Sequence, residues 1–175
     1  MNLHRFVFVT CVKGIAGLGM LAACNSEPAK VPPAKQTPAP AAPTNDLPGD
    51  ARSAETAAAA DVLQRYYAAL QARDFKTAYA LWSDHGQASK QTFEAFQAGF
   101  AATRATRVEL ETPGDVEGAA GSLYVSIPVQ VYAELNDGQR QHFSGNYVLR
   151  RVNDVAGSSA EQRTWHIASA TLRAK

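Results

Sequence analysis

The spacing of apolar residues changes near Arg107, and this change limits the folds open to the chain. Before it, apolar side chains recur every three or four residues, as in Val62, Tyr66 and Leu70. After it they alternate, as in Val125, Ile127 and Val129. An α-helix repeats about every 3.6 residues and a strand every two. The pattern predicts an α+β fold in which three N-terminal helices are followed by an antiparallel sheet.

The helical part divides into three segments, over residues 57–73, 75–82 and 89–102. Alanine and long polar side chains favour the first helix, and Asp74 separates it from the second. Ser89 is a suitable N-cap for the third, whose Phe93, Phe96 and Phe100 form an apolar stripe. The sequence therefore predicts one long helix followed by two shorter ones.

Four strands are predicted, over residues 108–112, 122–135, 141–152 and 164–172. Asp137-Gly138, preceded by Asn136, supplies the positive φ that a tight hairpin turn requires, so the second and third strands pair. Pro128 interrupts the long second strand without a backbone donor, which predicts a bulge or a sheet edge at that point. In the last strand, Trp165 and Ile167 face one way.

Several short segments of the sequence resemble the nuclear-transport-factor-2-like superfamily, also called cystatin-like. The resemblance covers residues 57–172, and its motifs are not unique to the family. It is carried by Tyr66-Tyr67-Ala68-Ala69-Leu70, Arg73-Asp74-Phe75 and Ala78-Tyr79-Ala80-Leu81-Trp82 for the opening helices, and by Trp165-His166-Ile167 for the closing strand. The resemblance implies a sheet wrapped around the long helix into a cone, often with a pocket between them. The family includes ketosteroid isomerase, scytalone dehydratase and limonene epoxide hydrolase, but also members that only bind, so the fold fixes no function.

A pocket in such a cone would be lined by aromatic side chains. The candidates are Tyr66, Tyr67, Trp82, Phe96, Phe100, Tyr147 and Trp165. The resemblance implies an oxyanion-stabilising role for a tyrosine on the first helix, and we expect Tyr66 or Tyr67 to face inward. The alternative is core packing, in which the hydroxyl reaches a polar partner.

Other candidate catalytic groups are weaker. The isomerase uses acids on its strands, whereas strand alternation turns Glu109, Glu111 and Glu134 outward. Asp84-His85 is either an acid–base pair or a solvated turn. We assign no catalytic residue from the sequence.

The remaining histidines suggest neither a metal site nor a catalytic one. His142 and His166 lie on predicted strands, where a polar cluster with Tyr147 or Asn146 is conceivable, although alternation turns both histidines to solvent. The histidines lack ligand spacing, and the glycines at 14, 17 and 19 fall in the leader rather than after a strand. We therefore expect no metal and no cofactor.

Residues 1–23 have the layout of an export signal. Arg5 and Lys13 precede a short apolar run over 14–21, which is too short to span a membrane. Leu21-Ala22-Ala23-Cys24 resembles the bacterial lipobox, which implies that Cys24 carries acyl groups such as palmitate and anchors the protein to a membrane. The alternatives are a signal cleaved without lipidation and an uncleaved anchor. Asn25 in place of aspartate favours the outer membrane, with the protein facing the periplasm.

A tether follows over residues 24–52. Seven of the chain's nine prolines lie there, with few large apolar side chains, so no core can form. Proline favours extended chain, and this segment is predicted to be a spacer. A proline-rich ligand for a partner is the alternative. Residues 53–175 then form the folded domain.

The charge of the chain argues against nucleic acid. It has 17 basic and 16 acidic residues, and loss of Arg5 and Lys13 with the leader leaves it close to neutral. A nucleic-acid partner would require a basic stripe, whereas Arg150-Arg151 is the only adjacent basic pair in the predicted domain. The two cysteines, Cys11 and Cys24, leave no internal disulfide after cleavage, and lipidation would consume the remaining thiol.

Three functions follow from these features. The favoured one is a noncatalytic envelope lipoprotein that binds a partner protein, peptide or small apolar ligand. The alternative is an isomerase, lyase or hydrolase that uses Tyr66 or Tyr67 with an acid or histidine in the pocket. The third is a homodimer that pairs through the outer sheet face, where Tyr124 and Tyr132 lie.

Overall fold

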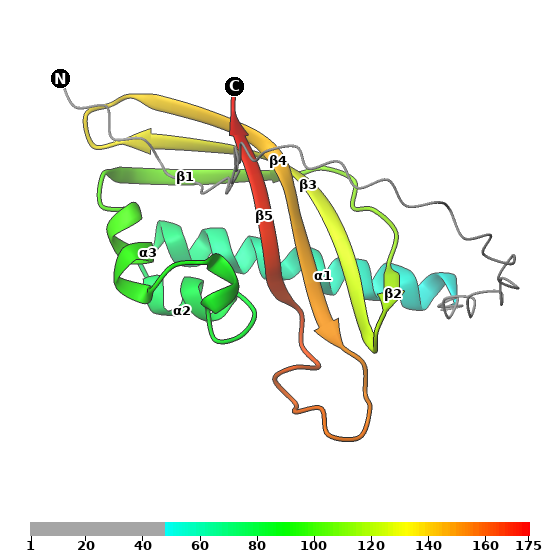
Figure 1. Cartoon of the computed structure of the whole chain (residues 1–175). Helices are drawn as coiled ribbons and strands as arrows, with labels where there is room; N and C mark the ends of the chain where they lie inside the picture. Colours follow the sequence, from blue (N-terminus) through cyan, green and yellow to red (C-terminus); the bar gives the residue numbers. More distant parts are fainter. Residues whose placement is uncertain (1–47) are drawn as a thin grey trace, which may run out of the picture. The chain divides into compact units, whose positions relative to one another are not determined.

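The computed structural model, which describes residues 48–175, places three α-helices before a five-stranded antiparallel sheet (Figure 1). The α+β prediction is confirmed. The helices are α1 (Gly49–Gln71), α2 (Phe75–Ala80) and α3 (Phe93–Gly99), with a short 3₁₀ turn, η1 (Gln87–Ser89), between the last two. The strands are β1 (Thr103–Leu110), β2 (Glu117–Ala119), β3 (Ser122–Leu135), β4 (Arg140–Val152) and β5 (His166–Ala174).

Helix α1 begins at Gly49 rather than at residue 57, so residues 49–52, predicted as tether, are helical. The start of this helix was predicted from its stripe of apolar residues. The first turns of α1 lack that stripe, and their side chains are mostly exposed. Alanine-rich sequence favours the helix there by its intrinsic propensity. None of the helices of residues 48–175 is long and apolar enough to cross a membrane.

The third helix was predicted with the wrong cap. Helix α3 begins at Phe93, and the Thr92 hydroxyl accepts a hydrogen bond from Ala95 N at 3.2 Å. Ser89 ends η1 instead, and its hydroxyl donates to Gly86 O at 2.7 Å. Both residue types suit an N-cap, and only the backbone path selects Thr92. Helix α2 ends before Trp82, which forms a bridge to Ile167.

The sheet has the strand order β1-β3-β4-β5, and β2 also pairs with β3. Strand β3 has the predicted bounds, and β3 and β4 join through the predicted turn, where Gly138 has φ 85°. Strand β1 begins earlier than predicted, at Thr103, and β2 was not predicted at all. A three-residue strand carries too little alternation to be recognised in sequence.

Pro128 lies at a local edge and not at a bulge. The β3–β4 register runs without a shift through Pro128, which is opposite Asn146. On its other side β1 has already ended at Leu110, and Pro128 O accepts from Glu111 N at 2.9 Å. The Pro128 nitrogen faces the same side as its carbonyl, so the missing donor falls just beyond the end of β1 and not within the paired part of the ladder.

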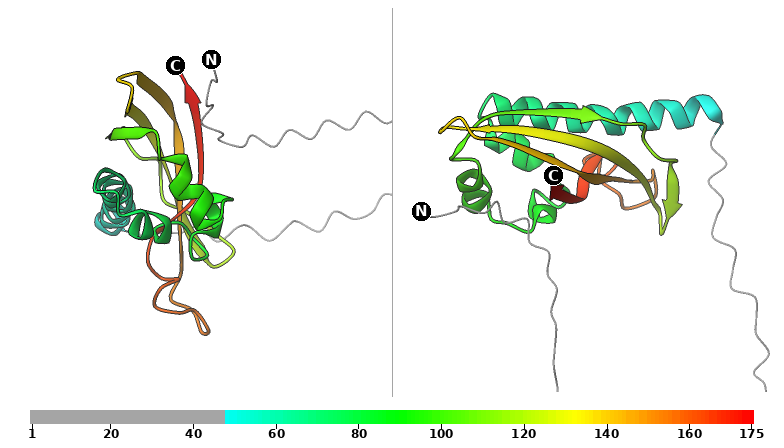
Figure 2. Two further views of the ribbon diagram at one scale, coloured as in Figure 1. Left: turned by 90° about the vertical axis from the view of Figure 1, so that its left-hand side faces the viewer. Right: turned by 90° about the horizontal axis from the view of Figure 1, so that it is seen from above.

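The sheet is curved, and α1 lies along one of its faces (Figure 2). Odd-numbered β3 residues, such as Val125, Ile127 and Val129, point toward α1 and are almost fully buried. Even-numbered residues point the other way, to what we call the outer face. Burial of apolar surface between α1 and the sheet is the main stabilising contribution to such a layered fold. Alternation thus divides the domain into an aromatic interior and a polar outer face.

Candidate functional site

Five of the seven predicted pocket residues meet in the interior between α1 and the sheet. These five, which we call the aromatic cluster, are Tyr66, Tyr67, Trp82, Phe96 and Tyr147. The Tyr66 ring lies 5.1 Å from that of Tyr67 and 6.1 Å from that of Trp82, centroid to centroid. Both distances and the nearly perpendicular planes are those of favourable edge-to-face aromatic pairs. Both tyrosines of α1 face inward, whereas the sequence analysis predicted this of one of them.

A hydrogen bond joins two tyrosine hydroxyls in this interior. The Tyr67 hydroxyl lies 2.8 Å from the Tyr147 hydroxyl, and both side chains are almost fully buried. Burial raises the pKa of Tyr67 and of Tyr147 far above the ordinary tyrosine value, because an ionised phenol would lose its water. Burial and the neighbouring Tyr147 do the same to the pKa of Tyr66. All three phenols are therefore neutral hydrogen-bonding groups at ordinary pH.

The two other predicted pocket residues lie outside this cluster. Phe100 is only partly buried, and its ring packs against those of Phe96 at 5.2 Å and Phe75 at 6.0 Å. Trp165 is buried in a different place, where its Nε1 donates to Glu55 Oε2 at 2.9 Å. The seven residues thus do not share one pocket.

The interior holds no acid or imidazole among residues 48–175. The buried polar residues of this part of the chain are Thr103 and Ser122, together with the tyrosine hydroxyls and the indole nitrogens. Trp82 Nε1 is buried without a hydrogen-bond partner among the described residues. Proton transfer requires a group whose pKa lies near the working pH, and neutral phenols do not supply one. The cluster can pack, and can donate hydrogen bonds, but it lacks a general base.

Glu55 links α1 to the sheet through hydrogen bonds, and the sequence analysis did not identify this residue. Its carboxylate receives hydrogen bonds from Arg151 Nε at 2.9 Å, from Arg151 Nη2, and from the Trp165 indole. The Arg151 bond lowers the pKa of Glu55, and partial burial opposes that effect. The Arg151 guanidinium also lies 5.7 Å from the centre of the Trp165 ring. We call these three residues the Glu55 clamp, and its role is structural.

The outer face carries an ordered stack of three side chains. Arg107 on β1 lies 4.6 Å above the ring of Tyr132 on β3, and the Tyr132 ring stacks on His142 of β4 at 4.6 Å, with the planes 7° apart. Register places the three side by side, because Tyr132 pairs with Arg107 on one side and with His142 on the other. We call Arg107, Tyr132 and His142 the outer stack.

Hydrogen bonds hold the outer stack in place. His142 Nε2 and Gln130 Oε1 lie 2.8 Å apart, and Gln130 Nε2 donates to Glu111 Oε1 at 2.7 Å. The Tyr132 hydroxyl donates to Glu109 Oε2 at 3.3 Å, and Arg107 pairs with Glu109 through Nη1. The stack was not predicted. The sequence did contain a signal for part of it, because a hairpin centred on Asp137 places Tyr132 opposite His142.

The other histidines form no shared site. His85 Nδ1 lies 3.2 Å from Glu161 Oε1 rather than against Asp84, so of the two interpretations of Asp84-His85 the acid–base pair is not formed. His166 and His142 both lie on strand positions that face away from Tyr147, and a cluster of these histidines with Tyr147 is not formed. Within residues 48–175 no three His, Cys, Asp or Glu side chains are placed to hold a metal.

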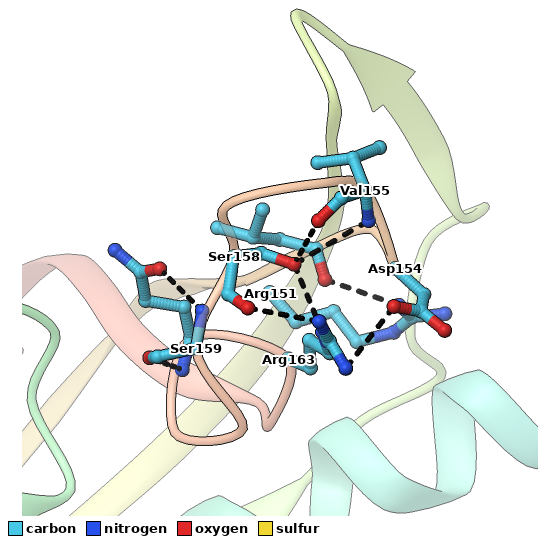
Figure 3. A network of polar contacts seen from close by, with 8 residues as sticks. Arg151, Asp154, Val155, Ser158, Ser159 and Arg163 are labelled. Atoms are coloured by element: carbon cyan, nitrogen blue, oxygen red, sulfur yellow. Dashed lines mark hydrogen bonds and ion pairs between the residues drawn. The ribbon is translucent and has the colours of Figure 1, made fainter.

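The loop between β4 and β5 is built around Arg163 (Figure 3). Arg163 pairs with Asp154 at 3.1 Å and donates from Nε to Ser158 Oγ and from Nη2 to Ser158 O, both at 2.8 Å. Ser158 Oγ in turn donates to Val155 O at 2.7 Å. This loop orders itself locally and presents Glu161 to His85. Cys24 and the predicted tether before Pro48 lie outside the described residues.

Comparison with known proteins finds similar structures but no related sequence. No family model matches the sequence, and no curated protein matches it. A proposed aromatic ring hydroxylase from Novosphingobium aromaticivorans is similar in structure, with a TM-score of 0.51 and 13% identity, over 70% of this chain and 94% of that one. A proposed scytalone dehydratase from the same species has a TM-score of 0.49 and 14% identity, over 70% and 85%.

A nuclear-transport-factor-2-like superfamily protein from Salmonella enterica serovar Typhimurium has a TM-score of 0.49 and 12% identity, over 70% of this chain and 92% of that one. The predicted arrangement, three helices followed by an antiparallel sheet, is confirmed by the structure itself. At such identities the likeness concerns the fold alone.

Proposed function

From the nuclear-transport-factor-2-like fold of residues 48–175, we propose that this protein is a noncatalytic binding module of the bacterial cell envelope. In this proposal a lipid on Cys24 holds it at a membrane, most simply the outer one, where it faces the periplasm. The folded domain binds a partner protein through the outer face of its sheet. The outer stack of Arg107, Tyr132 and His142 is the observation that carries the proposal.

The outer stack has the chemistry of a binding surface. Tyrosine and arginine are enriched among residues that dominate protein interfaces, because they combine a large contact area with polar tips. Here their side chains are already ordered by stacking and by hydrogen bonds to Glu109 and Gln130. Less conformational entropy is then lost when a partner binds. A polar and aromatic surface of this kind suits a folded protein better than a small apolar ligand.

The interior supports the same choice. The aromatic cluster occupies the space between α1 and the sheet, and its polar groups are neutral at ordinary pH. The strand acids lie on or beside the outer face, away from the tyrosines of the aromatic cluster. These acids are Glu109, Glu111 and Glu134. A substrate in the cone would meet hydrogen-bond donors but no base among the described residues.

The binding proposal can be tested by photo-crosslinking in cells. A photoreactive residue is placed at Ser144, which lies on the outer face opposite Gln130, or at Gln64, which is exposed on α1. We expect a discrete adduct from Ser144 and none of that mass from Gln64. Adding Arg107→Ala or Tyr132→Ala should weaken the Ser144 adduct roughly tenfold, since truncation of a dominant interface residue costs about 1–2 kcal/mol or more. An adduct that survives both substitutions would contradict the proposal, as would no adduct.

The anchor has a separate test. The wild-type chain should incorporate labelled palmitate and sediment with membranes, whereas Cys24→Ser should do neither, because two or more acyl chains hold a protein to a bilayer firmly. Sequence supports this part of the proposal through the lipobox-like Leu21-Ala22-Ala23-Cys24. If Cys24→Ser still carries the label, another residue is modified and the assignment fails.

One observation favours the enzymatic alternative. Tyr67 and Tyr147 place two phenols in the interior, and Trp82 Nε1 lies in the same cluster without a partner. Such donors can stabilise an oxyanion, as in an isomerase, lyase or hydrolase, if a substrate opens the cluster. A small carbonyl-bearing probe that quenches Trp82 fluorescence saturably, and loses this effect in Tyr67→Phe, would support this alternative over the binding module.

A further inference from the structure

A small polar pocket lies where the segment after α2 passes the edge of the sheet. Its volume is about 260 Å³, and it is lined by the segment after α2 together with Arg150 of β4 and Ala168 of β5. The residues from that segment are Ser83, Asp84, Gln87, Ala88 and Lys90. The segment is held at the sheet by Ser83 N donating to Ile167 O at 2.9 Å and by Ile167 N donating to Leu81 O at 2.8 Å. None of these seven residues belongs to the aromatic cluster or the outer stack.

Most of the charged groups that line this pocket have no partner in the described fold. Neither the Lys90 ammonium nor the Asp84 carboxylate has a side-chain partner among residues 48–175. Arg150 donates from Nε to Ser122 Oγ at 3.1 Å, and its two terminal nitrogens make no bond to the part of the chain that the structure describes. Two cations and one carboxylate are thus left facing a shared space.

The backbone that carries Asp84 and Lys90 is strained. Asp84, His85 and Lys90 have φ of 55°, 54° and 62°, a region that side chains with a Cβ seldom adopt. Ala88 N donates to Ser83 O at 3.1 Å, and His85 pairs with Glu161 at 3.2 Å, so the turn is held from both sides. Gly86 is required within it, because a Cβ there would lie 2.1 Å from the Tyr79 ring. Strain of this kind is retained where it places particular side chains.

We propose that this pocket binds a small zwitterion with the layout of an α-amino acid. Its carboxylate would lie between Lys90 and the free end of Arg150, and its ammonium group against Asp84. The volume suits such a ligand, because a water molecule takes about 30 Å³ of liquid and the pocket therefore holds on the order of ten non-hydrogen atoms. Ser83 and Gln87 add neutral hydrogen-bonding groups.

The opposite charges of the lining select this class over a simple ion. A lone carboxylate would satisfy Lys90 and Arg150 but would approach Asp84 with like charge, which disfavours binding. A lone ammonium ion would meet two cations. A ligand that carries both groups pairs all three side chains, and charge-assisted hydrogen bonds of this kind are the strong ones. The pocket does not depend on the proposed partner surface, so either can fail alone.

The test is a titration of the purified, ¹⁵N-labelled full chain followed by NMR. L-alanine is the probe, and acetate and ethylamine are its two halves. We expect saturable shifts at the amides of Gly86, Ala88 and Ala168 with L-alanine, and at least tenfold weaker binding of either half. Absence of saturation with L-alanine up to about 100 mM would overturn the proposal.

Matched variants distinguish the roles of the charges. Lys90→Met and Arg150→Met should each lower the affinity for L-alanine about tenfold. Asp84→Asn should lower the affinity for L-alanine while raising that for acetate, which a merely structural role would not do. Gln64→Met on the exposed side of α1 is the control and should bind as the wild type does. Equal binding of L-alanine to the wild type and to all three pocket variants would contradict the assignment.

Discussion

At the scale of single residues, Tyr67 and Tyr147 depend on one another. Each hydroxyl is buried, and the pair is 2.8 Å apart. Tyr67→Phe or Tyr147→Phe alone leaves the other hydroxyl buried without that partner, which should lower the free energy of unfolding by about 1–3 kcal/mol. The double variant removes both groups and should cost less than the sum. Urea unfolding measures this, and strictly additive losses would show that the hydroxyls do not interact.

The same tyrosines make the domain sensitive to alkali. Their pKa values are raised in the folded state by burial, so the unfolded chain releases these protons first, near pH 10. The resulting stability is fully present below pH 10 and is lost as pH rises, by about 1.4 kcal/mol per pH unit for each tyrosine. Urea midpoints between pH 9 and 11 should fall less steeply in Tyr67→Phe/Tyr147→Phe than in Tyr124→Phe, a partly exposed control. Equal slopes would contradict the buried assignment.

At the scale of elements, the Glu55 clamp decides how firmly the N-terminal half of α1 is attached. The first turns of α1 bury little surface, and the carboxylate of Glu55 joins them to β4 and to Trp165. Glu55→Ala should lower the free energy of unfolding by roughly 1–3 kcal/mol, as is usual for hydrogen bonds to a charged group. The neighbouring Asp61→Ala, whose pair with Arg65 is exposed, is the control and should cost less than about 1 kcal/mol.

The clamp also predicts a pH dependence in acid. The folded state lowers the pKa of Glu55, so its contribution is present above the ordinary glutamate value of 4.5 and is lost as pH falls below it. The wild type should therefore lose more stability between pH 6 and 3 than Glu55→Gln. Parallel profiles would mean that Arg151 contributes nothing through charge.

At the scale of the whole molecule, the polarity of the outer face predicts the oligomeric state. Permanent homodimer interfaces are rich in apolar side chains, whereas this face is mostly polar around the outer stack. We therefore expect the chain to be a monomer at about 10 μM by light scattering, with its partner a different protein. A stable mass of two chains, abolished by Arg107→Glu, would instead make a second copy the occupant of this face.

Much of the fold follows from local patterns in the sequence. The bounds of β3, the turn at Asp137-Gly138 and the inward position of Trp165 and Ile167 all depend on neighbours within a few residues. Alternation and helical spacing are fixed by backbone geometry, so they survive in any tertiary context. The errors occur where local signals are equivalent, as with Ser89 and Thr92, or too short, as with β2.

The candidate sites were decided by tertiary structure. Tyr67 meets Tyr147 across 80 residues of sequence, and Glu55 meets Trp165 across 110. Asp84 and Lys90 share a pocket with Arg150 only because a strained turn is held against β5. Sequence by itself determined which faces are apolar and, through resemblance, which family to expect. Which polar groups are paired and which remain free depends on register and helix placement, and these are set by the packing of the whole domain.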